Sequence, residues 1–525
     1  VRQGGFTGAG INAITRSGDN EWRWSVFANN RTQAFAGDTI AGLTAAEGTA
    51  FNRTALNTSR FNVFQFGGRL SGPIIQDKLF FFLNYERETN TSPGTNYRAL
   101  RPGETVGGVI TRVPVSTLDT LRQFLISKYN YDPGAYDGYD RVTFSDKATG
   151  KLSWNIDESN KFNIRFQYLR SQADILTSNS FSGLVASGNR NGTTDAINFS
   201  NANYFINNDI YSAIAELNSV VGSNISNNLI VGFTANRDYR DSRSRPFPFV
   251  DILSGGTTPT TLTSFGYELF TPFNKLDTDT WQLQDNVTVS AGDHTITAGV
   301  SLEAFRFVNG FNPRYYSYYR FNSVQDFYNS ANGVRVPVRI GTGAAARDTM
   351  VVAQPSVFSQ TFSALPNGAT PLAVTQAYQA GIYVQDEWNA SSLLKVTLGL
   401  RVDAPIFDQS TAIANRTVDT TAFYNDITKN TERLSTGNLP ATNLLFSPRL
   451  GFNLDVNGDR SIQIRGGSGL FSGRPPFVWL SNVITNNGVT VGDVLQVSSA
   501  ASPILNRQFD TSVTRYVPTN AATAL

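Results

Sequence analysis

Thirteen short segments of this chain alternate apolar and polar residues with a period of two, and short and long connections join them in strict rotation. In residues 394–403, LKVTLGLRVD, every second residue is Leu or Val and the residues between them are Lys, Thr, Gly, Arg and Asp. Successive side chains of a strand point to opposite faces, so such a segment has one apolar and one polar face. Together with the alternating connections and the lack of a long covering helix, this pattern is typical of a transmembrane β-barrel.

The predicted strands follow one another at residues 21–30, 64–74, 79–88, 151–157, 162–170, 211–221, 229–240, 281–290, 295–307, 378–388, 394–404, 446–456 and 462–471. Tight connections at 76–78, 158–160, 223–228, 291–294, 389–392 and 457–459 are expected to close hairpins. The last of them contains Asn-Gly, the strongest signal for a two-residue turn. The remaining connections are too long for a soluble domain, but outer-membrane barrels have short periplasmic turns and long extracellular loops.

Composition excludes several other classes of protein. Charged residues are 16% of the chain, well below the roughly 25% of soluble domains. The net charge of +2 argues against a nucleic-acid partner, and the absence of cysteine excludes disulfides and cysteine-ligated metals. The apolar run 79–83 is far shorter than the ~18 residues of a membrane helix. A two-layer sandwich remains the alternative, although strands this numerous and loops this long rarely fit one.

No catalytic or metal-binding set stands out. His294 is the only histidine and it lies in a predicted turn, so no site that needs a histidine pair or a histidine-based triad is expected. Residues 5–10 lack the G-x-G-x-x-G order of a phosphate-binding loop, and residues 455–459 lack the glutamate that completes a calcium loop. We therefore expect no enzyme, no cofactor and no bound metal.

Two sets of side chains are assigned by the faces of the predicted strands. Aromatic residues on apolar faces near strand ends are expected to form girdles at the level of the lipid headgroups: Trp22, Trp24, Tyr85, Tyr211, Trp281 and Trp388. Charged residues on polar faces are expected to point into the lumen: Arg165, Glu216, Glu303, Arg401, Asp403, Arg449 and Arg465. The lumen-facing set would hold a plug and satisfy its own charges, or, as a sharper hypothesis, line a transport path.

The long connection 308–377 contains an aromatic cluster, Tyr315, Tyr316, Tyr318 and Tyr319. Aromatic side chains on loops offer flat apolar area at low entropic cost, so these tyrosines are candidate substrate contacts. An extension of the neighbouring strand with girdle residues is an equal alternative. Short helices are predicted at 116–128 and 323–330, each with a serine as N-cap.

Five stretches resemble TonB-dependent outer-membrane receptors, and within these the Oar-like group, whose members carry a carboxypeptidase-regulatory-like domain. They are GGFTGAGINAITRSGDNEW (4–22), FGGRLSGPIIQDKLFFFLNYE (66–86), GDHTITAGVSLEAF (292–305), QAGIYVQDEWNASSLLKVTLGLRVDAP (379–405) and IRGGSGLFSGRPPFVWLSN (464–482). The resemblance implies a cell outer-membrane location and a plug domain that fills a barrel of roughly 22 strands. Residues 1–20, with a short strand at 11–15, would be the end of the plug, and residues 21–525 a partial barrel with long extracellular loops.

The same resemblance implies a receptor that binds an extracellular substrate and imports it with the TonB–ExbB–ExbD energy-coupling complex, with a surface lipoprotein as an optional partner. The substrate has no readable motif. The chain starts at Val1 without a signal peptide, so we expect the interior of a longer protein. A barrel that acts as an adhesin or as a conduit for secreted proteins is the alternative function.

Thirteen strands cannot close a barrel of roughly 22. We therefore expect an open antiparallel sheet whose first and last strands, 21–30 and 462–471, do not pair with each other. Unpaired backbone at such edges is not tolerated in lipid, so the isolated polypeptide should aggregate.

Overall fold

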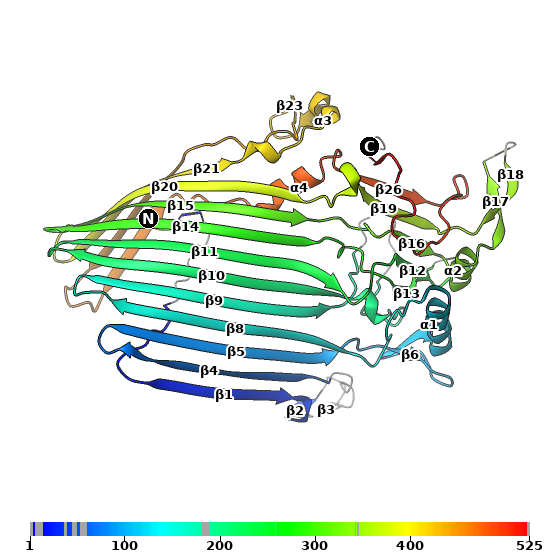
Figure 1. Cartoon of the computed structure of the whole chain (residues 1–525), viewed down its shortest axis with the longest axis horizontal. Coiled ribbons are helices and arrows are strands. Elements are labelled where there is room, and N and C mark those ends of the chain that lie inside the picture. The colour runs from blue at the N-terminus through cyan, green and yellow to red at the C-terminus, as the bar shows by residue number, and fades with distance from the viewer. Residues whose placement is uncertain are drawn as a thin grey trace.

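The largest sheet of the protein is a curved antiparallel wall that carries a smaller folded layer at one end (Figure 1). The structure is a computed structural model that describes residues 4–5, 14–35, 39–44, 50–52, 60–180, 189–257, 259–341, 343 and 346–521. The short turns lie at the end of the wall opposite the folded layer (Figure 1). We call the large sheet the wall, and the layer built from the long connections the cap.

The wall is a 13-stranded sheet in which each strand is antiparallel to its neighbours. Its strands are, in spatial order, β1 (Arg23–Thr32), β4 (Asn62–Ile75), β5 (Leu79–Pro93), β8 (Asp140–Asn155), β9 (Asn160–Ile175), β10 (Tyr204–Val221), β11 (Ile225–Ser242), β14 (Lys275–Ala291), β15 (His294–Gly310), β20 (Ala373–Asn389), β21 (Leu394–Phe407), β24 (Leu445–Asp455) and β25 (Gln463–Gly469). All thirteen strands predicted for the wall are present. Most strands extend further toward the cap than the alternation indicated, because pairing continues above the region where one face must be apolar.

Two of the predicted turns need correction. The connection predicted at 223–228 is shorter, since β10 ends at Val221 and β11 begins at Ile225. The Asn-Gly connection is not a two-residue turn, because β24 ends at Asp455 and β25 begins at Gln463. The Asp455 carboxylate accepts the backbone N–H groups of Gly458 and Arg460 at 3.0 Å each, and this capping holds a longer loop.

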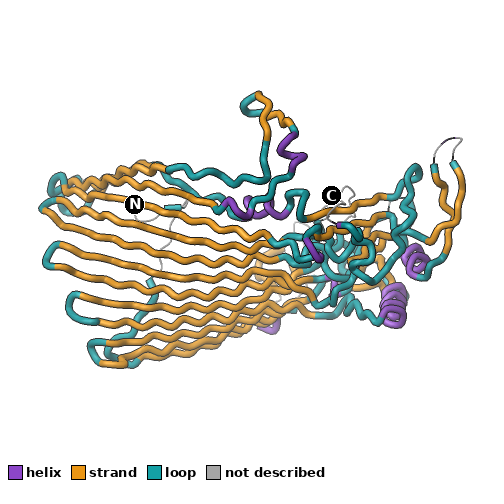
Figure 2. Tube along the Cα trace, turned by 45° about the horizontal axis from the view of Figure 1, so that its top comes forward, coloured by secondary structure: helices purple, strands orange, loops and turns teal. Residues whose placement is uncertain are grey.

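The wall is open, as predicted. The sheet begins with β1 and ends with β25, and no pairing joins these two strands within the described part of the chain. Figure 2 shows the wall as a curved sheet, not a closed barrel. Aggregation of the isolated polypeptide remains a prediction.

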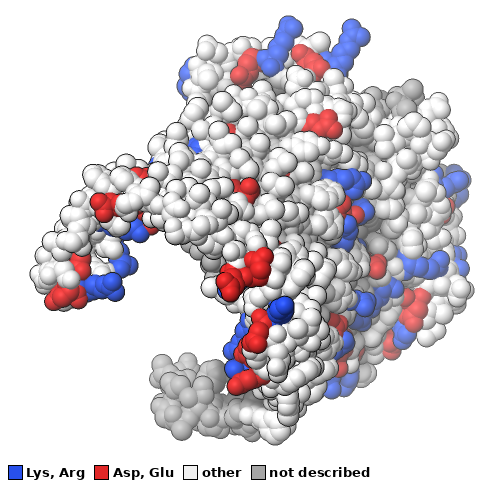
Figure 3. Space-filling view, turned by 60° about the vertical axis from the view of Figure 1, so that its left-hand side comes forward, with Lys and Arg blue, Asp and Glu red and all other residues white. Residues whose placement is uncertain are grey.

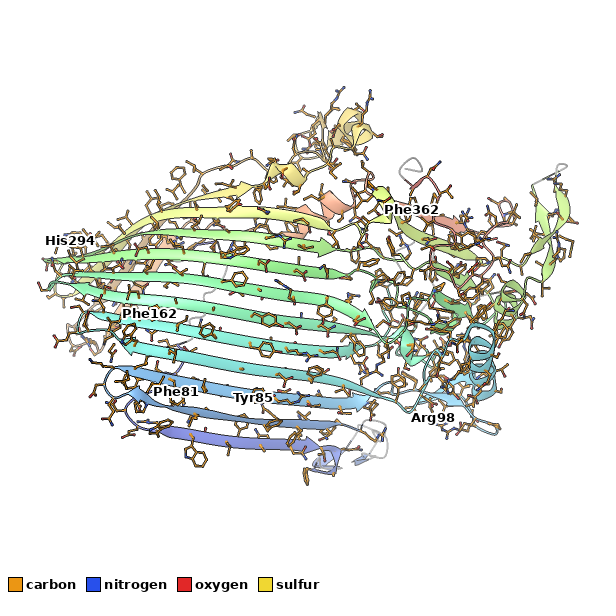
Figure 4. All side chains as sticks on the ribbon, viewed as in Figure 1. Phe81, Tyr85, Arg98, Phe162, His294 and Phe362 are labelled. Carbon is orange, nitrogen blue, oxygen red and sulfur yellow. The ribbon has the colours of Figure 1, made fainter. Side chains whose placement is uncertain are left out.

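One face of the wall is an apolar band. Leu398, Val300 and Phe166 are 49%, 46% and 51% exposed, although large apolar side chains are normally buried in soluble proteins. The predicted girdle residues Trp22, Trp24, Tyr85, Tyr211, Trp281 and Trp388 are also exposed. Phe81, Tyr85 and Phe162, labelled in Figure 4, belong to this outward face by their alternation along β5 and β9. Lipid is the environment in which such a face is stable.

The cap has its own sheet and its own apolar core. The sheet has the order β13 (Thr261–Phe265), β12 (Phe249–Leu253), β16 (Tyr318–Phe321), β19 (Val357–Ser363) and β26 (Val491–Val497), with β12 and β16 parallel. Helices α1 (Val115–Tyr129) and α2 (Val324–Ala331) pack on it through Leu121 and Phe327, both fully buried. Several long connections therefore fold together into one layer.

Both helices of the cap match the predicted positions. Ser323 caps α2, since its side chain accepts from Asp326 N. The predicted serine cap of α1 is wrong: Pro114 is the N-cap and makes no side-chain hydrogen bond. Proline fixes φ near the value at which the helix begins, here −68° at Pro114.

Smaller elements complete the described structure. They are the strands β2 (Thr39–Thr44), β3 (Ala50–Asn52), β6 (Arg98–Leu100), β7 (Ile110–Pro114), β17 (Arg335–Ile340), β18 (Arg347–Val352), β22 (Ala422–Asn425) and β23 (Asn430–Arg433), the helices α3 (Arg416–Thr420) and α4 (Val478–Thr485), and short 3-10 turns at Gln33–Phe35, Ser200–Ala202, Pro366–Gly368 and Gln409–Thr411. Among the described residues, no helix is long and apolar enough to cross a membrane. Most of the strand predicted at 11–15 lies outside the described residues, and Ile14 and Thr15 are not in a strand.

Candidate functional site

The inner face of the wall, opposite the apolar band, carries the candidate site. The cross-strand register places all the charged residues predicted for the lumen on this face: Arg165, Glu216, Glu303, Arg401, Asp403, Arg449 and Arg465. Figure 3 shows the wall curving toward a free edge, with acidic and basic side chains in mixed groups. The role of these residues in transport stays a hypothesis.

Arg401 and Asp403 form the most buried charged pair of the wall. They lie two residues apart on β21, on the same face, and their side chains are 4% and 1% exposed. Arg401 donates from Nη2 to Asp403 Oδ1 at 2.7 Å and from Nε to Asp403 Oδ2 at 2.8 Å. Arg401 Nη2 also donates to Ser301 Oγ at 2.8 Å, and the guanidinium lies 5.1 Å from the Tyr383 ring centroid. A bidentate pair with these supports has one fixed geometry.

Two glycines make room for this pair. A Cβ at Gly381 would lie 2.4 Å from Arg401 Nη2 and 2.7 Å from Asp403 Oδ1, so no larger residue fits between them. The backbone of Gly4 also approaches the guanidinium, because a Cβ there would lie 2.2 Å from Arg401 Nε. The N-terminal segment thus contacts the inner wall at its most buried ion pair.

A second contact of the N-terminal segment lies nearby. Gly5 forms a parallel bridge with Gly473, and Arg474 Nε donates to the Gly5 carbonyl oxygen at 3.4 Å. Arg474 also pairs with Glu303, with Nη1 and Oε2 3.3 Å apart. The charged inner face and the residues after β25 therefore hold residues 4–5 from two sides.

A chain of polar side chains continues from this pair across the wall. The Tyr383 hydroxyl donates to Asn286 Oδ1 at 2.5 Å, and Asn286 Nδ2 donates to Asn228 Oδ1 at 3.2 Å. Asn228 Nδ2 then donates to Glu216 Oε1 at 2.7 Å. The network joins β20, β14, β11 and β10, so polar groups of the inner face satisfy one another.

Three of the predicted lumen residues are not members of this chain of hydrogen bonds. Arg165 lies opposite Lys151 on the neighbouring strand, and its Nε has no hydrogen-bond partner in the described structure. Arg449 lies 4.6 Å from the Phe471 ring centroid, and Arg465 is exposed and donates to Gln463. These three are on the predicted face, and Arg449 lies near enough to Arg401 and Asp403 for their charges to interact.

Helix α4 packs on the inner face of the wall near the cap. Phe477, just before the helix, stacks on Phe307 with ring centroids 4.3 Å apart, and Asn309 Nδ2 donates to Ser481 Oγ at 2.7 Å. Beside the helix is a hollow of about 380 Å³, lined by polar and apolar residues: Ile206, Asp238, Tyr239, Arg240, Asn274, Lys275, Leu276, Asn309, Phe311, Val478 and Asn482.

A buried acid lies behind this hollow. Glu268 is 0% exposed, and its Oε2 accepts from Thr271 Oγ1 at 2.7 Å and from Phe270 N at 2.9 Å. Burial raises the pKa of the Glu268 carboxyl, while the Thr271 and Phe270 hydrogen bonds and Arg240, 4.0 Å away, oppose that rise.

The tyrosine cluster divides into two pairs. Tyr318 and Tyr319 are 0% exposed in the cap core, so the prediction that they contact a substrate is corrected: strand β16 uses them for packing. Tyr315 and Tyr316 are only partly buried and pack edge-on against Phe273 and Tyr267, with centroids 5.0 Å apart in each case. Substrate contact remains a prediction for Tyr315 and Tyr316.

The cap also contains a fully buried ion pair that the sequence did not reveal. Arg190 donates from Nη2 to Asp251 Oδ2 at 2.7 Å, and both side chains are 0% exposed. Tyr318 and Ser264 donate to the same carboxylate at 2.8 Å and 2.6 Å. Burial would raise the pKa of Asp251, but Arg190 and the two hydroxyls outweigh it and hold that pKa below its usual range.

Sequence reasoning missed several residues of the site. Asn286, Ser301 and Tyr383 lie at polar-face positions of predicted strands, so the alternation itself could have identified them. Arg474 and Arg190 lie in connections without any periodic signal, and only the fold brings them to their partners.

His294, the only histidine of the chain, makes its contacts at the turn end of the wall. His294 is at the turn end of β15 (Figure 4), where its Nδ1 lies 2.7 Å from Asp386 Oδ2 and its ring stacks on Trp388. In the described part of the chain, no group of three or more His, Cys, Asp or Glu residues could hold a metal ion.

Comparisons with known proteins agree with this architecture. Residues 14–525 match the profile of a family described as outer membrane beta barrel domain. An 82-residue stretch, 16% of this chain and 7% of the relative, is 42% identical to the TonB-dependent transporter Oar of Myxococcus xanthus.

The comparison with solved structures gives two distant likenesses. The outer membrane transporter YddB of Escherichia coli is 10% identical, with a TM-score of 0.49, and the match covers 92% of this chain and 47% of that one. The ferric enterobactin receptor PfeA of Pseudomonas aeruginosa is 10% identical, with a TM-score of 0.40, over 88% of this chain and 45% of that one. The chain thus spans about half the length of these structures.

Proposed function

Because the chain belongs to the outer membrane beta barrel domain family, and lies in the outer membrane, we propose that it forms the wall and cap of a TonB-dependent transporter. The cap would bind an extracellular substrate, and the TonB–ExbB–ExbD complex would drive its import through a plugged lumen. The partly similar relative is itself a TonB-dependent transporter.

One observation carries the proposal: the inner wall holds the N-terminal segment at its buried ion pair. Gly4 contacts Arg401, and Gly5 accepts from Arg474. These contacts of residues 4–5 support the assignment of residues 1–20 to the end of a plug. A wall that anchors a plug from inside is what a gated import route needs, whereas an adhesin needs no such contact.

The test is energised uptake by cells that express the full-length gene. Fluorescently labelled mixtures of short peptides and of oligosaccharides serve as probes, in a strain with a functional TonB and in a strain without it. Accumulation inside the outer membrane only when TonB works is expected. Surface binding without TonB-dependent accumulation of either probe would instead favour an adhesin or a protein conduit.

A matched pair of variants sharpens this test. Asp403→Asn weakens the ion pair that faces Gly4, and Asp459→Asn changes an exposed turn carboxylate instead. Asp403→Asn should lower TonB-dependent uptake and leave surface binding unchanged, because the cap is untouched. Equal uptake in both variants would count against a plug anchor at Arg401. A surface lipoprotein partner, if it exists, would act at the cap and should co-purify with both variants.

A further inference from the structure

Charged side chains form an alternating row on the outward face of the wall, directly above its aromatic girdle. Cross-strand register brings together one residue from each of six neighbouring strands, and on the next strand Arg306 lies opposite Asp279; the six are Arg87, Asp146, Arg170, Asp209, Arg237 and Asp277. The row contains basic and acidic residues in turn, and Tyr85, Tyr168 and Tyr211 lie two positions closer to the turn end. Ionic side chains on a lipid-facing wall belong at its boundary with water.

The depth of the row agrees with that boundary. On β9, ten residues separate Asn160 at the turn end from Arg170. At about 3.4 Å per residue and a tilt of about 40°, Arg170 lies roughly 26 Å above the turn. The apolar band of an outer-membrane barrel is about 25 Å tall. The row therefore lies at the headgroup level on the cap side, which is the outer leaflet because the short turns are periplasmic.

Most arginines of the row have carboxylate partners, but Arg170 does not. Arg87 Nη1 lies 2.9 Å from Asp146 Oδ1, and Arg237 Nη2 lies 2.6 Å from Asp279 Oδ1. Asp146 is further occupied by the Tyr85 hydroxyl at 2.7 Å. Among the described residues no carboxylate oxygen lies within 4.0 Å of the exposed Arg170 guanidinium, whose recorded neighbour is the Phe144 ring at 5.8 Å.

An apolar groove lies directly below Arg170 on the same face. It has a volume of about 310 Å³ and runs over β8 to β11. Its lining combines small residues, Ala148 and Gly150 on β8 and Ala213 on β10, with aromatic residues and two polar ones: Phe166, Tyr168, Tyr211, Phe233, Gln167 and Ser212. Tyr168 and Tyr211 approach each other at its upper end, with ring centroids 5.5 Å apart. A groove of this shape on a lipid-facing wall matches an acyl chain.

We propose that Arg170 and this groove form a specific site for one phosphorylated lipid of the outer leaflet. The acyl chain lies in the groove, and the headgroup phosphate accepts charge-assisted hydrogen bonds from the guanidinium, which binds phosphate in a two-pronged geometry. The acidic neighbours Asp146 and Asp209 keep the row as a whole near neutrality, so one phosphate is selected at Arg170 instead of a diffuse anionic layer. The site depends on the outer-membrane location and is independent of transport.

The experiment uses the purified full-length protein in detergent and native mass spectrometry. The probes are diphosphorylated lipid A and its monophosphorylated form, and the measured quantity is the fraction of protein that retains one lipid. Arg170→Gln should lower retention of the diphosphorylated lipid about tenfold, which corresponds to ~1.4 kcal/mol. Arg339→Gln, an exposed arginine on the β17–β18 hairpin, is the matched charge control and should change nothing.

A second pair of variants tests the groove. Ala213→Phe fills it, whereas Ala298→Phe makes the same change elsewhere on the outward face, at an exposed position of β15. Loss of retention in Ala213→Phe alone supports the site. Asp146→Asn distinguishes a lipid site from a row of ion pairs that only stabilises the wall. If Arg170 binds the phosphate, removing the neighbouring carboxylate should preserve or raise lipid retention. Equal retention by Arg170→Gln and wild type, or equal loss in Asp146→Asn and Arg170→Gln, would overturn the proposal.

Discussion

The wall exposes its large apolar side chains, whereas the cap buries them. In the wall, Phe166 is 51% exposed and Leu398 49% exposed, while the inner face is a network of polar groups. In the cap, Phe321 and Phe327 are 0% exposed and pack on each other with centroids 5.5 Å apart. The cap hides its apolar side chains from water by itself, whereas the wall needs lipid to do so.

This difference changes what each region tolerates. A charge on the outward face of the wall is costly only where lipid surrounds it, but a cavity or an unpaired charge in the cap is costly in any solvent. The cap should therefore hold its structure in detergent and at the cell surface alike, while the wall depends on the membrane around it.

The strongest test of the comparison is an all-or-none labelling pattern. Single cysteines replace Gln325, exposed on α2 of the cap, and Asn457, exposed in the β24–β25 turn. On α2 the choice of position matters, because Ser330 at the end of the same helix is fully buried and could not be labelled. In whole cells that express the full-length protein, a membrane-impermeant maleimide should label position 325 and leave position 457 unlabelled. Permeabilised cells, the control, should label both. The reverse pattern would invert the orientation of the wall.

The buried ion pair of the cap should give the next largest effect. Asp251→Asn leaves the Arg190 guanidinium buried without its carboxylate, and breaking such pairs costs about 3–5 kcal/mol. The measurement is the free energy of opening from amide hydrogen exchange in β12. Asp348→Asn removes an exposed pair with Arg339, 3.8 Å apart, and should cost less than about 1 kcal/mol. Similar losses of opening free energy in both variants would show that the Arg190–Asp251 pair stabilises the cap no more than an exposed ion pair does.

The faces of the wall can be tested at one residue pair of β9. Phe166→Arg places a charge near the middle of the apolar band and should lower wall stability in lipid by about 2–4 kcal/mol. Gln167→Arg puts the same side chain on the inner face and should have little effect. Urea unfolding in lipid vesicles measures both. A harmless Phe166→Arg beside a harmful Gln167→Arg would mean that the faces are reversed.

The smallest expected effect is a pH dependence in the cap. Burial raises the pKa of Glu268 in the folded cap, so the folded state favours the protonated acid. The stability that protonation of Glu268 contributes is fully present below the ordinary pKa of 4.5. It is lost as the pH rises through the higher pKa of the folded state. Glu268→Gln should therefore stabilise the cap slightly at pH 7 and match wild type below pH 4.5. Hydrogen exchange in β12 at both pH values measures this. A difference that grows toward low pH would contradict the sign.

The alternation of apolar and polar residues predicted the strands of the wall. The sequence of the long connections predicted two helices of the cap but not its sheet. All strands of the wall were identified because a lipid-facing sheet must repeat one apolar residue in two, and the side chains of Arg401 and Asp403 were placed on the correct face by the same argument. The Asn-Gly turn failed because the Asp455 carboxylate captures backbone N–H groups and holds a longer loop. Asp455, which is not part of the Asn-Gly pair, therefore determines the length of this connection.

The sequence alone determined the compartment, the strand order and which side chains face lipid, since each depends on a period of two along one strand. Only the tertiary structure decided that Tyr318 and Tyr319 are core residues, that Arg190 reaches Asp251, and that Gly4 meets Arg401. These contacts join residues from different connections or from opposite ends of the chain. Their geometry follows from how the connections pack against one another, and local periodicity carries no information about that packing.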